Sequence, residues 1–484
     1  MNADVDMHSS RRSLHNMVIA AGIGASMLFT IVGLSSGLQM YGDGSIFSYA
    51  VAAQDAWLFH WHNISGRLFT YGFAYIPAEA YVALTKSARG GILVYGLLFF
   101  SAPLLGLFVT LAADRTTNRV IFGYACLSTA CLCPLVFGAP TEMWMAHAVF
   151  WPALALCLCA SVNLRGTFAV FASLLALVFT HEGAIVLSIA ILSALFLRGW
   201  RDVLFVRALG AFLVVMTVWL IVKMTIRPDD YIASVLAAAA YKFIDVRNLG
   251  QPAFLLLLAA LAGYGVAVVL LRRINSAKAE FYAVGACAAI LALYWRWFDS
   301  SLLTEARYNL RTALLIATPV FGVLAAVHAM HEEERRKSLF PFLAPLADTI
   351  GNRLNPRTIF GAILLTMLVY TVETTKFVWG WMDYKAAVRA LAAGIKSDPV
   401  LGDPLFVSSK RIDTSLNRLA WNSTTPYLSV LVAPDLKPTR LVVDPDANYF
   451  WLSCETAAKS EQTSTAIPAT SRHLVRLHAC LHRQ

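Results

Sequence analysis

The sequence has few charged residues for its length. Only 14% of its 484 residues are Asp, Glu, Lys or Arg, whereas a soluble domain carries about a quarter. Hydrophobic residues make up 58% of the chain. Apolar runs of about 20 residues recur, and this is the length that crosses a bilayer as a helix. The scarcity of charge argues against a soluble enzyme and predicts an all-α, polytopic membrane protein.

Several familiar motifs are missing. The sequence has no glycine-rich loop that would cradle a nucleotide phosphate, so we do not expect ATP-driven chemistry. It has no internal repeat with a clear period, which argues against a transporter built from inverted repeats. The formal net charge of +10 would suggest a nucleic-acid partner for a soluble protein. Here the basic residues cluster in short loops between apolar runs, so no nucleic acid is expected.

Eleven apolar segments are predicted to span the membrane. They are residues 17–34, 91–113, 120–138, 148–162, 167–182, 184–198, 208–224, 252–271, 279–298, 311–330 and 358–380. Residues 69–84 are interrupted by Pro77 and Glu79, and we expect them to be interfacial or re-entrant. Residues 1–16 are polar and no cleavable signal peptide is evident, so the first span is expected to remain in place.

The charges of the loops predict the orientation in the membrane. With a cytoplasmic N-terminus, every loop on the cytoplasmic side is basic, as the positive-inside rule requires. These loops are 114–119, 163–166, 199–207, 272–278 and 331–357. On the opposite side, residues 139–147 and 181–183 contain no Lys or Arg. We therefore expect a large first outer loop, residues 35–90, and a C-terminus on the outer (periplasmic) side.

The composition changes after the last predicted span, which closes a transmembrane domain over residues 17–380. Residues 381–484 are expected to form a small α/β domain on the periplasmic side, beginning with an amphipathic helix. Three β-branched runs within it predict strands, at 404–409, 427–434 and 439–445.

The tail of this domain contains two cysteines. Cys454 and Cys480 would share an oxidising compartment, so they are candidates for a disulfide. The alternative is metal binding by Cys480 with nearby histidines, but no closed ligand set follows from the spacing.

Polar residues gather at four places on the predicted outer side. Asp43 lies between two glycines in the first outer loop. A carboxylate within hydrogen-bond reach of a sugar hydroxyl can act as a general base. Arginines can bind a departing phosphate through bidentate hydrogen bonds. We therefore predict Asp43 to be catalytic. The predicted substrate-binding residues are His62, Asn63, Arg67, Glu142, His181, Glu182, Arg307 and Arg311.

These residues also have structural interpretations. Asp43 is a good N-cap for the helix that follows it, and Arg67 can extend along the membrane interface. Arg307 and Arg311 are spaced for one helix face and can pair with nearby acids. His60 and His62 are separated by one residue, which does not form a strong zinc motif, so no metal ligands are assigned.

The layout and short motifs resemble those of the GT-C integral-membrane glycosyltransferases. The stretch from Asp43 to NISGRLF at residues 63–69, together with THEG at residues 180–183, is similar to bacterial proteins of the O-antigen glucosyltransferase-like kind. The resemblance implies sugar transfer from a polyprenyl-phosphate-linked donor to an envelope glycan or lipid acceptor on the outer face. It also implies a location in the bacterial inner membrane, with the outer side facing the periplasm. Asp43 would take the place of the loop aspartate of that family.

One departure from the resemblance concerns a cofactor. The commonest family pattern has two adjacent acids, whereas Asp43 is followed by Gly44. No cofactor is assigned, and a divalent cation remains an open alternative. Two other functions also remain open: a non-catalytic protein of envelope polysaccharide assembly, and a lipid or solute transporter.

Overall fold

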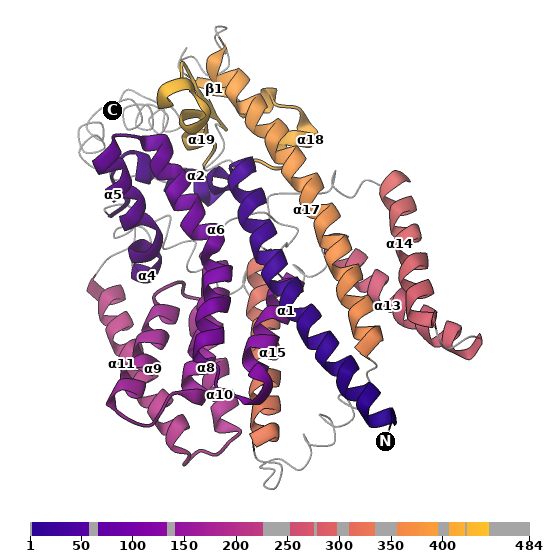
Figure 1. The fold of residues 1–484 in the computed structure, drawn as a ribbon. Coiled ribbons are helices and arrows are strands. Elements are labelled where there is room, and N and C mark those ends of the chain that lie inside the picture. Colours follow the sequence, from indigo (N-terminus) through magenta and orange to yellow (C-terminus); the bar gives the residue numbers. More distant parts are fainter. Residues whose placement is uncertain are drawn as a thin grey trace.

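The computed structural model describes most of the chain (Figure 1). The described residues are 2–57, 66–132, 141–225, 252–274, 278–297, 309–333, 356–394, 406–421 and 424–444. Within these ranges, seven helices are long and apolar enough to cross a membrane. The chain is therefore a multi-pass helical membrane protein, as its composition predicts.

Each predicted span overlaps a helix. These helices are α1 (Asn2–Ser36), α6 (Ala88–Ala113), α7 (Val120–Leu132), α8 (Glu142–Cys159), α9 (Leu164–Val178), α10 (Ala184–Phe196), α11 (Val203–Thr225), α13 (Pro252–Ile274), α14 (Ala279–Trp297), α15 (Asn309–Glu333) and α17 (Pro356–Ala393). The seven that meet the length and hydropathy requirement are α1, α6, α8, α11, α13, α15 and α17. Eleven membrane crossings therefore stay a prediction.

The start of α8 differs from the prediction. Residues 139–147 were expected to form an outer loop, but α8 begins at Glu142, so Glu142 and His147 are both helical. The side chain of Thr141 caps this helix by accepting a hydrogen bond from the Met143 N–H. An early cap followed by buried polar residues is easily mistaken for a loop, because a hydropathy pattern registers only the apolar part of a helix.

The segment expected to be interfacial or re-entrant is helical. It consists of α4 (Leu68–Thr70), a π-helical turn (Tyr71–Tyr75) and α5 (Ile76–Thr85). Pro77 lies within a continuous helical run, because the preceding Tyr75 and Ile76 also have right-handed helical backbone angles. The proline comes just after the π-helical turn and does not interrupt the helix.

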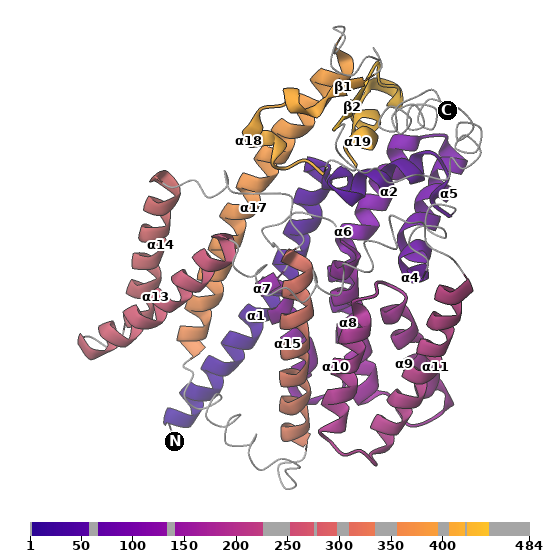
Figure 2. The same ribbon diagram turned by 180° about the vertical axis from the view of Figure 1, so that it is seen from behind.

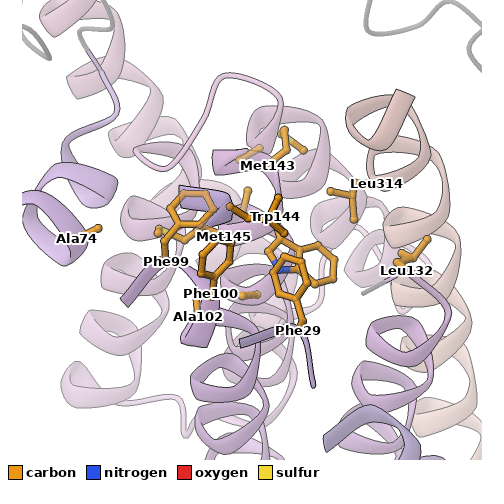
Figure 3. Packing of buried hydrophobic residues seen from close by; sticks show 14 of the residues in the cluster. Phe29, Ala74, Phe99, Phe100, Ala102, Leu132, Met143, Trp144, Met145 and Leu314 are labelled. Atoms are coloured by element: carbon orange, nitrogen blue, oxygen red, sulfur yellow. The ribbon is translucent and has the colours of Figure 1, made fainter. Parts of the chain in front are cut away.

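The centre of the bundle is packed by aromatic side chains and small residues (Figure 3). Phe29 of α1 meets Phe100 of α6 and Trp144 of α8 edge-on, with ring centroids 5.3 Å and 5.7 Å apart. Gly106 of α6 lies so close to the backbone of Ala148 that a Cβ would come within 2.4 Å of its carbonyl oxygen. Small residues of this kind let membrane helices approach closely when they pack against one another.

Helices α13 and α14 stand to one side of the bundle and pack against α17 (Figures 1 and 2). Helix α17 is continuous from Pro356 to Ala393, so the last predicted span and the amphipathic helix after residue 380 are one element. This long helix connects the bundle to the residues that follow it.

One end of the molecule carries α2 (Asp43–Ala52), the end of α1 and a C-terminal unit (Figures 1 and 2). We call it the α2 end. The C-terminal unit, residues 406–444, contains α18 (Thr414–Asn417), α19 (Thr425–Val432) and the parallel strands β1 (Phe406–Ser408) and β2 (Leu441–Val443). The prediction of strands at 404–409 and 439–445 is confirmed.

The prediction of a strand at 427–434 is wrong, because residues 425–432 form α19. Pro426 occupies the first turn of this helix, and all eight of its residues are buried. Burial on every side removes the polar alternation that separates helix from strand, so a short apolar run is ambiguous in sequence.

Basic side chains of the bundle form hydrogen bonds with the C-terminal unit. Arg89 of α6 and Arg389 of α17 donate hydrogen bonds to the carbonyls of Ala433 and Val432. Lys385 of α17 donates to the Ser36 carbonyl at the end of α1, at 2.7 Å, and so joins α17 to α1 within the bundle. These carbonyls lie at helix C-termini, where cations are favoured. The C-terminal unit therefore sits at the same end of the molecule as the first long loop.

Candidate functional site

Arg67 is the centre of a network of ion pairs. Its guanidinium Nη1 lies 3.1 Å from Glu142 Oε1, and its Nη2 lies 2.9 Å from Glu182 Oε2. The other oxygen of Glu182 receives the ammonium of Lys223 at 2.9 Å. The side chains are 2% to 19% exposed. Two cations and two carboxylates thus form a charge-balanced cluster, the Arg67 network, which satisfies the pairing that buried charge requires.

Four separate elements supply the Arg67 network. Arg67 precedes α4, Glu142 begins α8, Glu182 lies in the turn between α9 and α10, and Lys223 ends α11. The backbone N–H of Phe69 donates to the Phe179 carbonyl at 3.0 Å. The Thr70 hydroxyl donates to the Thr180 carbonyl at 3.1 Å. These bonds hold the start of α4 against the α9–α10 turn.

Gly66 makes the close approach to α11 sterically feasible. Its φ of 96° lies in the region that favours glycine. A Cβ at this position would lie 2.9 Å from Lys223 Cε and 3.2 Å from Trp219 Nε1. The ammonium of Lys223 also lies over the Trp219 ring, 5.6 Å from its centroid. A larger residue at position 66 would therefore strain the backbone and require the Lys223 side chain to shift.

The histidine of the α9–α10 turn has a structural contact. His181 is fully buried, and its Nδ1 accepts a hydrogen bond from the Gly183 N–H at 2.9 Å. Because this nitrogen accepts, it carries no proton, and its 3.9 Å distance to Glu182 is not an ion pair. His181 therefore helps to hold the shape of the turn that presents Glu182.

The surroundings of Glu182 favour its charged form. Burial raises the pKa of this carboxyl, but Arg67 and Lys223 outweigh burial and hold the pKa well below its usual range. Burial lowers the pKa of Arg67, while Glu182 and Glu142 raise it to a net value above the usual range. Both groups are therefore charged at any physiological pH.

Asp43 lies apart from the residues of the Arg67 network, at the α2 end of the molecule. It is the first residue of α2, and Gly42, not Asp43, is the N-cap. Gly42 has φ 58° and ψ −132°, a combination that side chains other than hydrogen disfavour. The sharp turn predicted for the glycines around Asp43 is present at Gly42. The N-cap interpretation of Asp43 is wrong, although its charge lies in the first turn, where the helix dipole favours it.

Two buried tyrosines lie in the electrostatic surroundings of Asp43 and the Arg67 network. Tyr75 stacks on Tyr95 with ring centroids 5.2 Å apart and an interplanar angle of 13°. The charges that act on Tyr95 include those of Glu142 and Asp43. Burial, then Tyr95 and Glu142, raise the pKa of Tyr75 well above its usual value, against a smaller opposite effect of Arg67. The tyrosine pair is therefore influenced electrostatically by both groups.

An apolar cavity adjoins the Arg67 network. It has a volume of about 340 Å³ and lies between α6, α8 and α9. Phe69 and Phe73 border it, two and six residues after Arg67, and Met145 borders it one turn after Glu142. Ser173 is the one hydroxyl in the lining, and it donates to the Val170 carbonyl. The cavity therefore offers an apolar ligand a surface beside a charged cluster.

The structure thus brings together four of the predicted residues: Arg67, Glu142, His181 and Glu182. Asp43 lies on a separate element, at the start of α2. The side chains of six others lie outside the described residues: His62, Asn63, Arg307, Arg311, Cys454 and Cys480. In the part of the chain that is described, no three His, Cys, Asp or Glu side chains are grouped to hold a metal ion.

Lys223 is the member of the network that sequence reasoning did not identify. It ends an apolar helix, where a single lysine is typical of a membrane flank. Its pairing with Glu182 joins residues 41 positions apart. A signal did exist, because a lysine at the predicted outer end of a span contradicts the positive-inside rule and so calls for a specific partner.

Comparison of the chain with protein-family models, with curated proteins and with solved structures finds no match.

Proposed function

We propose that this protein is a membrane glycosyltransferase, which moves a sugar from a polyprenyl-phosphate-linked donor to an envelope glycan or lipid acceptor on the outer face. The observation that carries the proposal is the joining of an apolar cavity and an ion-pair network by one segment, residues 67–73. A donor of this class has the same two parts, an apolar chain and an anionic head group. The short motifs around Asp43 and Glu182 support the same reading.

In the proposed arrangement the lipid chain enters the cavity and the phosphate lies beside Arg67 and Lys223. Both cations already bind the two oxygens of one carboxylate, Glu182, from opposite sides. An arginine and a lysine held in this way can also bind phosphate oxygens. Glu142 and Glu182 keep the guanidinium oriented before the donor binds.

The chemical step assigns Asp43 the role of general base. Its carboxylate takes the proton of an acceptor hydroxyl, and the acceptor oxygen forms a bond to the anomeric carbon of the sugar. The bond between that carbon and the phosphate oxygen breaks, and polyprenyl phosphate leaves with the electron pair. Arg67 and Lys223 compensate the charge that develops on the phosphate.

The reaction class is tested by comparing a deletion strain with its parent. Lipid-linked sugars and envelope polysaccharides are extracted from both strains and analysed by mass spectrometry. We expect one sugar residue to be missing from a glycan or lipid of the deletion strain and its polyprenyl-phosphate donor to accumulate. An unchanged glycan and donor profile would contradict glycosyl transfer.

A second comparison separates catalysis from assembly or transport. The deletion strain is complemented with a variant that carries Asp43→Asn, Arg67→Met and Glu182→Gln together. A catalytic role predicts that the sugar stays absent although the variant is inserted at the wild-type level. Full restoration of the glycan would instead indicate a non-catalytic assembly protein or a transporter.

A further inference from the structure

The C-terminal unit packs directly on the turn that carries Asp43. Ser45 of α2 donates a hydrogen bond to the Thr424 carbonyl at 3.2 Å. Tyr49 of α2 lies against Tyr427 of α19, with ring centroids 5.5 Å apart. Thr424 and Tyr427 are 2% and 1% exposed, so the contact is closed to solvent. Residues almost 380 positions apart in the chain therefore form one packed surface.

Trp421 of this unit occupies the space beside Gly42. A Cβ built on Gly42 would lie 3.1 Å from Trp421 Cε2 and 3.2 Å from its Nε1. Gly42 is therefore constrained in two ways. Its positive φ restricts the backbone, and the indole ring packs against the residue. Asp43 follows Gly42 directly, so its carboxylate direction depends on this turn.

Tyr41 fixes the other side of the turn. Its ring is 1% exposed and meets Phe377 and Trp381 of α17 edge-on, at 5.0 Å and 5.1 Å. It also meets Trp421 edge-on at 6.4 Å. Tyr41 therefore contacts both α17 and Trp421, and the indole packs against two consecutive residues of the turn, Tyr41 and Gly42.

We propose that Trp421 is a positioning residue for Asp43, and that the C-terminal unit is part of the transfer site. The inference rests on the proposed function, in which Asp43 is the general base. Trp421 acts by holding the Tyr41–Gly42 turn, which sets where the Asp43 carboxylate stands relative to an acceptor hydroxyl. Misplacement of a catalytic group by about 1 Å can cost on the order of 10²-fold in rate.

The test compares three variants in membranes that carry the full chain. Trp421→Ala removes the ring, Trp421→Phe keeps an aromatic ring against Gly42, and Trp379→Ala is the control because Trp379 of α17 is 67% exposed. We expect Trp421→Ala to lower kcat for sugar transfer by on the order of 10²-fold, with KM little changed. We expect Trp421→Phe to recover most of kcat, and Trp379→Ala to match the wild type.

A second readout follows the packing without requiring activity. Ser45 is 1% exposed beneath the unit. Each variant is combined with Ser45→Cys, treated with a membrane-impermeant maleimide, and analysed at position 45 by mass spectrometry. We expect slow labelling in the wild-type and Trp421→Phe backgrounds and faster labelling with Trp421→Ala.

The outcomes separate this inference from the proposed function. Wild-type transfer that survives Trp421→Ala unchanged overturns the positioning role and leaves the glycosyltransferase assignment intact. A Trp421→Phe variant as inactive as Trp421→Ala overturns the account based on ring packing. Absence of transfer by the wild-type protein overturns both proposals, whatever the labelling result.

Discussion

Glu182 receives a different cation on each of its two oxygens, Arg67 on Oε2 and Lys223 on Oε1. Neither partner is adjacent to it in sequence, and each comes from another element. An exposed ion pair contributes little to stability, but removing one partner of a mostly buried pair leaves a charge without compensation. The contribution of Glu182 to the stability of the fold therefore depends on both cations being present.

Lys223→Met should destabilise the protein. The change leaves Glu182 Oε1 without its hydrogen-bond donor while keeping the length of the side chain. We expect a loss of about 1–3 kcal/mol in the free energy of unfolding, measured by thermal unfolding in detergent. Arg165→Met, at an exposed site in the first turn of α9, is the matched control and should have little effect. Equal stability of the two variants would show that the pair with Glu182 is unimportant.

The depressed pKa of Glu182 predicts how stability changes with pH. A carboxyl whose pKa is lower in the folded state stabilises the protein above the unfolded pKa, about 4.3 for Glu. That contribution is lost as the pH falls from there through the folded pKa. We expect the wild-type melting temperature to drop over this acidic range and the Glu182→Gln variant to show a weaker pH dependence. The same slope for both proteins would refute the assignment.

At the scale of elements, the contact between α4 and α11 depends on the backbone at Gly66. Gly66→Ala would force a Cβ against Lys223 and strain a φ of 96°. We expect destabilisation of at least about 1–2 kcal/mol from the backbone conformation alone, with steric overlap adding to it. Thermal unfolding measures the change.

Gly199→Ala is the control for that variant. Gly199 also has a positive φ, 146°, but a Cβ there meets nothing within 4 Å. It should therefore show the backbone cost without the steric contact. If Gly66→Ala is no more destabilising than Gly199→Ala, the close approach to Lys223 does not determine the stability of the network.

Hydropathy was sufficient to locate the membrane helices, because long apolar runs have few alternatives in a bilayer. It was insufficient where a helix is short and wholly buried, as α19 is, or begins with buried polar residues, as α8 does. The meeting of Arg67 with Glu142 and Glu182 was implied by their predicted common side of the membrane. The pairing of these residues, and the participation of Lys223, result from the packing of helices that are distant in the sequence. Local sequence patterns do not predict such contacts.

At the scale of the whole molecule, the two ends differ in their charged loops. Arg115 and Arg119 follow α6 at the end opposite α2, and Arg198 and Arg201 follow α10 at that same end. From the positive-inside rule we predict that this end is cytoplasmic and that α2 and the C-terminal unit are periplasmic.

Thiol labelling tests this orientation. Arg115→Cys and Lys437→Cys are made separately, since both positions are exposed and lie at opposite ends. In intact cells with a permeable outer membrane, a reagent that cannot cross the inner membrane should label position 437 and not position 115. Labelling of position 115 alone would reverse the predicted topology and place Asp43 in the cytoplasm, where a periplasmic transfer reaction could not occur.

The central claim is that Asp43 acts as the base for sugar transfer at the α2 end, beside a donor site formed by the Arg67 network and the apolar cavity. The most direct measurement is sugar transfer by the Asp43→Asn protein, with the inserted amount equal to that of the wild type. Asp383→Asn, at an exposed acid of α17, is the control. We predict that Asp43→Asn abolishes transfer while Asp383→Asn retains it. Wild-type transfer by Asp43→Asn would contradict the account.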